Sequence, residues 1–523
     1  MLFNSFVFIF FFLPTTLLVF FWIGKRNHHQ VAISWLVLCS LFFYGWWNPA
    51  YLSLILFSIL FNYACGVMLG NGNKQKTLKA LLVLGVAVNL GLLGYFKYTN
   101  FFVEQINLAL GSDYHVEKIL LPLAISFFTF QQIAYLVDAY RHEAKEYNFL
   151  HYCLFVTFFP QLIAGPIVYH KEMLPQFVKD TIYKFNYEHM VIGLTIFTIG
   201  LFKKVILADG MAVYATPVFN AAEAEAALTF FAAWGGALAY TLQIYFDFSG
   251  YSDMAIGIAY MFGIKLPINF NSPYKATSII DFWRRWHITL SRFLRNYLYI
   301  ALGGSRKGNM RRYINLFLTM LLGGIWHGAG WTFVLWGMLH GAYLMINYVW
   351  RKIRSDILMW SDNVSFLEIT VARVLTLLAV IIGWVYFRAG SVTGANHLVS
   401  TMFGFYGVSL PPRLEAKLGG LATQLQHLGF VFEGTFGGVS GEDYVVGTIW
   451  IILLLLISII MPNTQQFVAR FNPTIEDMSK KRLIETSYLK FSFTYFWCFI
   501  VSVMFAYSVI HLSRTGEFLY FNF

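Results

Sequence analysis

The chain has 523 residues, of which 58% are hydrophobic and only 12% are charged. Apolar runs near the ~20 residues that a bilayer-crossing helix needs recur along it, which excludes a soluble globular enzyme and predicts an all-α polytopic membrane protein. The formal net charge of +11 fits cytoplasmic loops that lie on membrane lipid, and we expect no nucleic-acid partner. The four cysteines have no pairing or metal-type spacing, so neither a disulfide framework nor a metal site is expected.

The N-terminal part reads as regularly spaced membrane spans. The first apolar run looks like a retained span, because it lacks a basic leader and a cleavage site and is followed by Lys25 and Arg26. The positive-inside rule then places 24–30 in the cytoplasm and the N-terminus outside. Further helices are predicted over 31–46, 50–70, 78–96 and 119–138. The connecting loops alternate in charge, which predicts 71–79 and 140–148 inside and 97–118 outside.

The middle of the chain is less regular. Between 149 and 266 the apolar runs are interrupted by "FPQLIAGP" and "FDFSGYSD". Polar residues with Pro or Gly at membrane depth usually line a cavity or a re-entrant turn, so breaks are predicted at both motifs.

The C-terminal part is again regular. Spans are predicted over 313–325, 331–350, 370–387, 445–461 and 491–511. A Gly-rich segment, 389–444, and the C-terminus are placed outside, and the net basic loop 463–490 inside. The total is roughly 11–13 transmembrane helices by the bilayer-length criterion. We expect one membrane domain over 1–523, with N-terminal spans in 1–140, a catalytic core in 141–350 and C-terminal spans in 351–523.

The segment "GGIWHGAGW", residues 323–331, places a histidine between two apolar stretches. The predicted arm 313–325 would cover only ~20 Å of a ~30 Å hydrocarbon core, so His327 is expected within the membrane thickness. The glycines permit a tight bend, and Trp326 and Trp331 could form the wall of a site. His327 could serve catalysis, or it could hydrogen-bond an open carbonyl at a helix end.

A second histidine lies in "DFWRRWHITLSRFLRNY", residues 281–297, which predicts one amphipathic helix at the cytoplasmic interface. Residues 281–312 contain eight Lys and Arg against one Asp, which could anchor anionic lipid or capture an anionic cytoplasmic donor such as a phosphate-bearing thioester. Ser291 is interpreted as a packing hydroxyl. The polar face of the predicted helix carries Arg284, His287, Ser291 and Arg295.

Two histidines in these positions fit acyl transfer. A sugar hydroxyl has a pKa far above 7, so its attack on a thioester needs a base, and a neutral imidazole is one near physiological pH. The developing oxyanion needs donors in a dry site, which Trp N–H, the second imidazole or backbone N–H groups could supply.

The two histidine segments, "DFWRRWHITLSRFLRNYLYIALGG" and "LLGGIWHGAGWTFVLWGMLHG", resemble the membrane-bound O-acyltransferase (MBOAT) family, in particular its bacterial branch that O-acetylates polysaccharides such as alginate. Other stretches that resemble this branch are "GYFKYTNFF", "LPLAISFFTFQQIAYLVDAYR", "LQIYFDFSGYSDMAIG" and "MPNTQQF". The resemblance implies a helical bundle with interfacial or re-entrant helices around a central tunnel. It makes His327 the presumed catalytic residue and assigns His287 to the upstream polar position.

The resemblance also implies the reaction. The expected donor is acetyl-CoA from the cytoplasm, with no bound cofactor, and the acceptor is a periplasmic or extracellular polysaccharide, either alginate or a related exopolysaccharide. A periplasmic acetyl-relay protein or an SGNH-type acetyltransferase is the expected partner, and the bacterial inner membrane the location. Peptidoglycan, cellulose and D-alanyl transfer to teichoic acid remain alternatives. A transporter or flippase is a different class, but the chain shows no inverted repeat.

Two features limit the resemblance. The family often has "LRDYLYIPLGG", whereas this chain has Asn296 and Ala301, and an amide at 296 cannot supply a carboxylate's charge for an ion pair with Arg292 or Arg295. In "YFDFSGYSD", Asp247 and Asp253 could line the tunnel or satisfy broken helix ends, and we favour the structural role.

Overall fold

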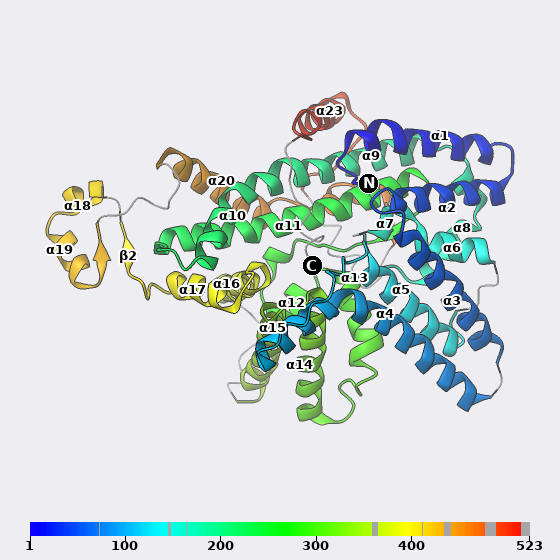
Figure 1. Cartoon of the computed structure of the whole chain (residues 1–523). Helices are drawn as coiled ribbons and strands as arrows, with labels where there is room; N and C mark the ends of the chain where they lie inside the picture. Colours follow the sequence, from blue (N-terminus) through cyan, green and yellow to red (C-terminus); the bar gives the residue numbers. More distant parts are fainter. Residues whose placement is uncertain are drawn as a thin grey trace.

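The structure is a computed structural model that describes residues 1–72, 74–144, 148–163, 165–357, 365–410, 412–432, 441–475 and 488–513. It is mainly helical with almost no sheet, as predicted. Within the described residues, β1 (Leu266–Pro267) pairs in parallel with β4 (Thr474–Ile475), and β2 (Val408–Ser409) with β3 (Phe430–Val431). Each strand has only two residues, so helix packing determines the architecture (Figure 1).

The N-terminal helices form a bundle, coloured blue to cyan in Figure 1. Its helix α4 is longer than predicted, because 97–110, expected as an outside loop, continues the helix that begins at Gln75. The charge of Lys97 does not end the helix, since its ammonium is buried against backbone carbonyls of another helix. The elements are a π-helical turn (Phe8–Phe12), α1 (Leu13–Gly24), α2 (His29–Gly45), α3 (Tyr51–Asn71), α4 (Gln75–Leu110), α5 (Ile125–Tyr140) and α6 (Phe149–Thr157).

Two long helical segments cross the centre of the molecule side by side (Figure 1). One is α9 (Tyr187–Phe202), which continues through a π-helical turn (Lys203–Ala208) into α10 (Asp209–Glu223), and the other is α11 (Phe230–Met261). A Cβ added to Gly193 would lie 2.6 Å from the carbonyl oxygen of Gly257, so the close contact of α9 with α11 requires glycine there.

The predicted break at "FDFSGYSD" is wrong, because the motif lies inside α11. The polar residues of the motif do not interrupt the helix, since lysines of the neighbouring segment pair with the two carboxylates. At "FPQLIAGP" the chain does break, into the single turn α7 (Phe159–Leu162) followed by non-helical backbone.

Helices α14 (Gly308–His327) and α15 (Trp331–Lys352) form an antiparallel hairpin, with α16 (Phe366–Arg388) against α15. Helix α14 begins five residues before the predicted span 313–325 and has 20 residues, which corresponds to about 30 Å. The added first turn carries Arg311 and Arg312, so the depth of His327 in the membrane stays a prediction.

The remaining elements connect these helices or form a lobe that projects from the bundle at the left of Figure 1. The lobe, residues 403–431, belongs to the segment 389–444 that the sequence places outside. Within that segment 411 and 433–440 lie outside the described residues, as do 476–487 of the predicted inner loop and the terminal "EFLYFNF". The other helices are α8 (His170–Phe177), α12 (Ile279–Trp283), α13 (Ile288–Phe293), α17 (Val392–Met402), α18 (Pro412–Leu418), α19 (Gly420–His427), α20 (Gly441–Ile460), α21 (Thr464–Phe467) and α23 (Tyr495–Ile510). Short 3-10 turns span Asp180–Tyr183, Pro273–Lys275 and Ala469–Phe471, and π-helical turns span Leu294–Tyr299 and Ile353–Ile357.

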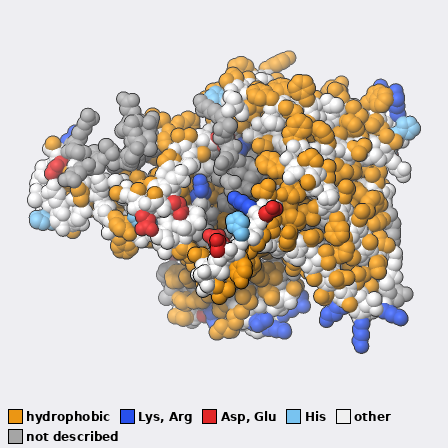
Figure 2. All heavy atoms as spheres, in the orientation of Figure 1, with side chains coloured by type: hydrophobic (Ala, Val, Ile, Leu, Met, Phe, Trp, Pro, Cys, Tyr) orange, Lys and Arg blue, Asp and Glu red, His pale blue; other side chains and the backbone are white. Residues whose placement is uncertain are grey.

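The surface has the character of a membrane protein. Hydrophobic side chains cover the bundle, and Lys and Arg gather along the lower edge in Figure 2. The α3–α4 turn, which was predicted to be cytoplasmic, lies at that same edge in Figure 1, and so does the start of α14. Among the described residues, four helical segments are long and apolar enough to cross a bilayer: Tyr51–Asn71, Gln75–Leu110, Tyr187–Glu223 and Phe366–Arg388. The all-α membrane fold is confirmed, whereas the number of crossings stays a prediction.

Candidate active site

His327 is the last residue of α14 and is 5% exposed. Three aromatic rings surround its imidazole, with distances between ring centroids of 4.9 Å to Trp326, 5.1 Å to Trp336 and 5.1 Å to Phe387. Trp336 lies on α15 and Phe387 on α16, so the junction of three helices encloses the ring.

Trp331 does not form part of this enclosure, contrary to the prediction. Its side chain is 55% exposed, and its Nε1 donates to Oε1 of Gln105 on α4 at 2.9 Å. The reason is helical geometry, since α15 begins at Trp331 and Trp336 comes more than one turn later on the face that meets His327. Trp336 takes the place that the sequence suggested for Trp331.

His287 is fully buried between α12 and α13 and has left-handed backbone, with φ of 41°. Its Nδ1 lies 3.0 Å from Oδ1 of Asn269, which also accepts a hydrogen bond from Oγ1 of Thr289. Because a carbonyl oxygen only accepts, this arrangement assigns the proton to Nδ1 and leaves Nε2 of His287 as a proton acceptor. Burial lowers the pKa of His287 to about 3, so the ring is neutral at pH 7.

The structure brings the two predicted histidines together. His287 lies close enough to His327 for the two imidazoles to interact electrostatically, although 40 positions separate them in the chain. The ring of Phe248 on α11 packs edge-on against His287, with centroids 4.7 Å apart. Base catalysis of acyl transfer needs a positioned base in a site shielded from water, and a buried neutral imidazole can be that base.

The predicted single helix over 281–297 is wrong, because the chain leaves α12 after Trp283 and re-enters a helix at Ile288. The loop before it supplies the alternative backbone hydrogen bonds: the N–H of Asn271 donates to the carbonyl of Arg285, and the N–H of Ile288 donates to that of Asn269, each at 2.9 Å. His287 therefore points into the protein instead of sharing a face with the neighbouring arginines.

Arg284, Ser291 and Arg295 instead line a cavity of about 1440 Å³. The cavity wall carries six cationic side chains and two acidic ones: Arg284, Arg285, Arg292, Arg295, Arg470 and Lys490, with Glu172 and Asp281.

Ion pairs neutralise two of these arginines. Arg292 forms a bidentate pair with Glu172 at 2.6 and 3.0 Å, and Nε of Arg285 lies 2.9 Å from Asp281. Arg295 donates to the amide oxygen of Asn296. The family often has Asp at this position, but the neutral amide leaves the positive charge of Arg295 without compensation. The wall keeps a net positive charge that suits an anionic ligand.

His327 is not among the residues that line this cavity, so a single passage through both histidines stays a prediction. Neither histidine is among its lining residues, and neither is Trp326. The wall reaches Met320 on α14, seven residues before His327, which is about 10 Å along the helix.

Asp247 and Asp253 lie outside the lining of this cavity, and each pairs with a lysine. Lys204 lies 2.6 Å from Asp247 and 2.8 Å from Asp209, and all three side chains are buried or nearly so. Lys203 lies 2.7 Å from Asp253. These carboxylates join α11 to the turn between α9 and α10.

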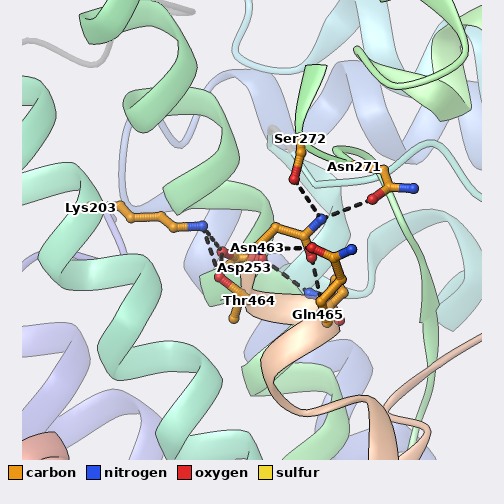
Figure 3. A network of polar contacts seen from close by, with 8 residues as sticks. Lys203, Asp253, Asn271, Ser272, Asn463, Thr464 and Gln465 are labelled. Carbon is orange, nitrogen blue, oxygen red and sulfur yellow. Dashed lines mark hydrogen bonds and ion pairs between the residues drawn. The ribbon is translucent and has the colours of Figure 1, made fainter. Parts of the chain in front are cut away.

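Asp253 also holds the C-terminal part of the chain (Figure 3). It accepts hydrogen bonds from Oγ1 of Thr464 at 2.6 Å and from Nε2 of Gln465 at 3.1 Å. Nδ2 of Asn463 donates to Asn271 and Ser272, in the loop that precedes His287. The "MPNTQQF" motif thus joins α11 to the loop that holds the second histidine.

Comparison with known proteins identifies the family of this chain. The model of the membrane-bound O-acyltransferase family matches residues 89–386, which include both histidines. A peptidoglycan O-acetyltransferase of Helicobacter pylori is 46% identical, over 78% of this chain and 81% of its own length. The chain belongs to the membrane-bound O-acyltransferase family. It is therefore an acyltransferase.

Other MBOAT relatives carry different names. A probable alginate O-acetylase of Pseudomonas putida is 41% identical, over 84% of this chain and 87% of its own length. A teichoic acid D-alanyltransferase of Bacillus subtilis is 33% identical, over 43% of this chain and 58% of its own length. The similarity to the two O-acetylating relatives extends over most of the chain.

Sequence reasoning missed several residues at the candidate site. Asn269 orients His287, and Trp336 contacts both His327 and a third buried histidine, His340. Nδ1 of His340 accepts a hydrogen bond from Trp283, a cavity residue, at 3.3 Å. The available signal was the i, i+4 spacing of Trp336 and His340, which puts both on one face of α15.

Proposed function

We propose that this protein transfers an acetyl group from acetyl-CoA, supplied from the cytoplasm, to a hydroxyl of a periplasmic or extracellular polysaccharide in a bacterial inner membrane. The buried His287–His327 pair, inside the segment that the family model matches, carries this proposal. The names of the Helicobacter pylori and Pseudomonas putida relatives support a polysaccharide acceptor, either peptidoglycan or alginate. D-alanyl transfer has less support, because that relative matches less than half of this chain.

His327 is the proposed base. It accepts the proton of the acceptor hydroxyl while that oxygen forms a bond to the thioester carbonyl carbon; the carbon–sulfur bond then breaks, and the proton passes to the leaving thiolate. His287, whose Nε2 is a proton acceptor, lies beside His327 and helps to keep the resting imidazole neutral and ready to accept a proton. The indole N–H of Trp336 is buried and makes no hydrogen bond within the described residues, so it is available to the oxyanion.

The cationic cavity is the proposed donor site. Arg284 and Arg295 lie in its wall without a carboxylate partner among the described residues, and phosphate groups are the natural ligands of such guanidinium groups. The thioester must then travel about 10 Å along α14 to reach His327. Transfer therefore requires the aromatic side chains that enclose His327 to move aside. The acceptor, or a periplasmic relay partner, arrives from the opposite side.

The proposed function is tested with the full chain in inside-out membrane vesicles. Acetyl-CoA labelled in the acetyl group is added outside the vesicles, which contain peptidoglycan or alginate fragments together with the periplasmic proteins of the source cell. We expect alkali-labile labelled esters on one of the two glycans, because the donor face is then accessible to the coenzyme. Failure to label either glycan, while the same vesicles retain the folded protein, would contradict the proposal.

Removing one free arginine from the cavity should weaken donor binding. For Arg284→Ala and for Arg295→Ala we expect the KM for acetyl-CoA to rise about 10-fold, because a hydrogen bond to a charged group contributes roughly 1.5–3 kcal/mol. Initial rates over a range of acetyl-CoA concentrations measure this, and kcat should stay within about twofold of wild type. Arg306→Ala is the matched control, because Arg306 belongs to the same basic segment but does not line the cavity. An equal effect in this control would assign the arginines to lipid anchoring.

A further inference from the structure

The C-terminal end of α14, which carries His327, is held by a charged residue from a distant part of the chain. The side chain of Lys97 on α4 is 8% exposed. Its Nζ donates to the carbonyl oxygens of Trp326 at 2.5 Å and His327 at 2.8 Å, and to Oγ of Ser126 at 3.5 Å. The next residue, Tyr98, donates its hydroxyl to the carbonyl of Ile325 at 2.6 Å.

These contacts answer a specific need of α14. The last carbonyls of a helix have no intrahelical donor, and burying them without one is costly. The chain leaves α14 at Gly328 with extended backbone, and no backbone N–H caps the helix there. Lys97 and Tyr98 thus supply donors for the carbonyls of all three final residues, Ile325, Trp326 and His327.

The positive charge of Lys97 also suits the C-terminal end of α14. The C-terminal end of a helix carries a partial negative charge, which a nearby cation stabilises. Among the described residues, no carboxylate lies within ion-pair distance of Lys97, so the carbonyls of α14 are what balance the buried ammonium. An ammonium has three protons, and Trp326, His327 and Ser126 accept all three. Direct contact with the substrate is therefore not the role of Lys97.

We propose that Lys97 is a positioning residue for catalysis: it fixes the end of α14 so that the imidazole of His327 is held where the acetyl group is transferred. This inference rests on the proposed function of His327. A misplacement of a catalytic group by about 1 Å can cost roughly 10²-fold in rate. The backbone carbonyl of His327 itself accepts a hydrogen bond from Lys97. Loss of the ammonium therefore displaces His327 directly.

The test uses Lys97→Met, which keeps the length of the side chain and removes the charge and its three hydrogen bonds. We expect kcat to fall about 100-fold, whereas the KM for acetyl-CoA stays within about twofold, because the donor cavity has no wall residue on α4. Tyr98→Phe is the matched variant, since it removes one hydrogen bond from the same helix end without changing the charge. Its kcat should fall less than about threefold, in line with the modest net value of one hydrogen bond.

A second measurement covers the case in which Lys97→Met does not fold. Lys97→Ala leaves space for a small amine, and ethylammonium added to this variant should raise kcat at least about 10-fold, with no effect on wild type. Unchanged kcat in folded Lys97→Met, an equal loss in Tyr98→Phe, or absence of amine rescue would each overturn the inference. If wild type itself transfers no acetyl, or His327→Ala remains active, the proposed function has failed and not the role of Lys97.

Discussion

We expect His327→Ala to lower acetyl transfer by at least roughly 10²–10⁴-fold, the usual contribution of a general base. The structure strengthens this expectation, because His327 is buried among Trp326, Trp336 and Phe387, and none of these three side chains can act as a general base. The labelled-ester assay in vesicles measures the loss. Thermal unfolding of the purified variant shows whether the protein remains folded.

The control for this experiment is another buried histidine. His170 on α8 packs against Tyr135 and Phe155 and lies outside the candidate site. His170→Gln also removes a buried imidazole, yet it should keep kcat within about twofold, because the substituted position takes no part in proton transfer. Substantial acetyl transfer by a folded His327→Ala variant would reject the assignment of the base.

The second large effect is expected at His287. Its backbone is left-handed, a conformation that asparagine tolerates better than most residues, so His287→Asn removes the imidazole with little added backbone strain. We expect kcat to fall roughly 10²-fold, because the proton acceptor beside His327 is lost. The KM for acetyl-CoA should remain near that of wild type, since His287 does not line the donor cavity.

Asn269→Leu tests the orientation of His287 separately. Loss of the Oδ1 acceptor frees the imidazole to change its tautomer, so this variant should reduce kcat without abolishing transfer, by about 10-fold. A rate equal to wild type in His287→Asn would show that His327 works without its neighbour. A KM increase with unchanged kcat would instead assign His287 to donor binding.

Much of the fold follows from hydropathy and charge. The predicted spans 31–46, 50–70 and 370–387 correspond closely to α2, α3 and α16, because each is a long apolar run between polar loops. Helix α4 shows where such reasoning ends. Lys97 looked like the start of a loop, but the carbonyls that accept its protons belong to α14, more than 200 residues later. Local sequence carries no sign of a partner that distant.

The same limit explains the two motifs that were interpreted wrongly. In "FDFSGYSD", Asp247 and Asp253 are compatible with a continuous helix only because Lys203 and Lys204 lie beside them. In "DFWRRWH", helical periodicity predicts one polar face, but the loop at Asn269 and Asn271 takes over the backbone hydrogen bonds at the break. Each error arises because a tertiary contact outweighs a local pattern.

The candidate site was predictable in its residue types but not in its shape. Histidine chemistry and the resemblance pointed to His287 and His327, and the structure brings these two residues together. The enclosure of His327 by Trp336 and Phe387 could not be predicted, because it depends on how α14, α15 and α16 pack against one another.

The attachment of "MPNTQQF" to α11 has a consequence for the limits of the smallest active fragment. The family model ends at residue 386, yet Gln465, Arg470 and Thr474 form part of the cavity wall, and β4 pairs with β1 next to it. A chain truncated after α16 would keep both histidines and lose one side of the donor cavity. The segment that the family shares, residues 89–386, is therefore shorter than the segment needed to complete the cavity wall.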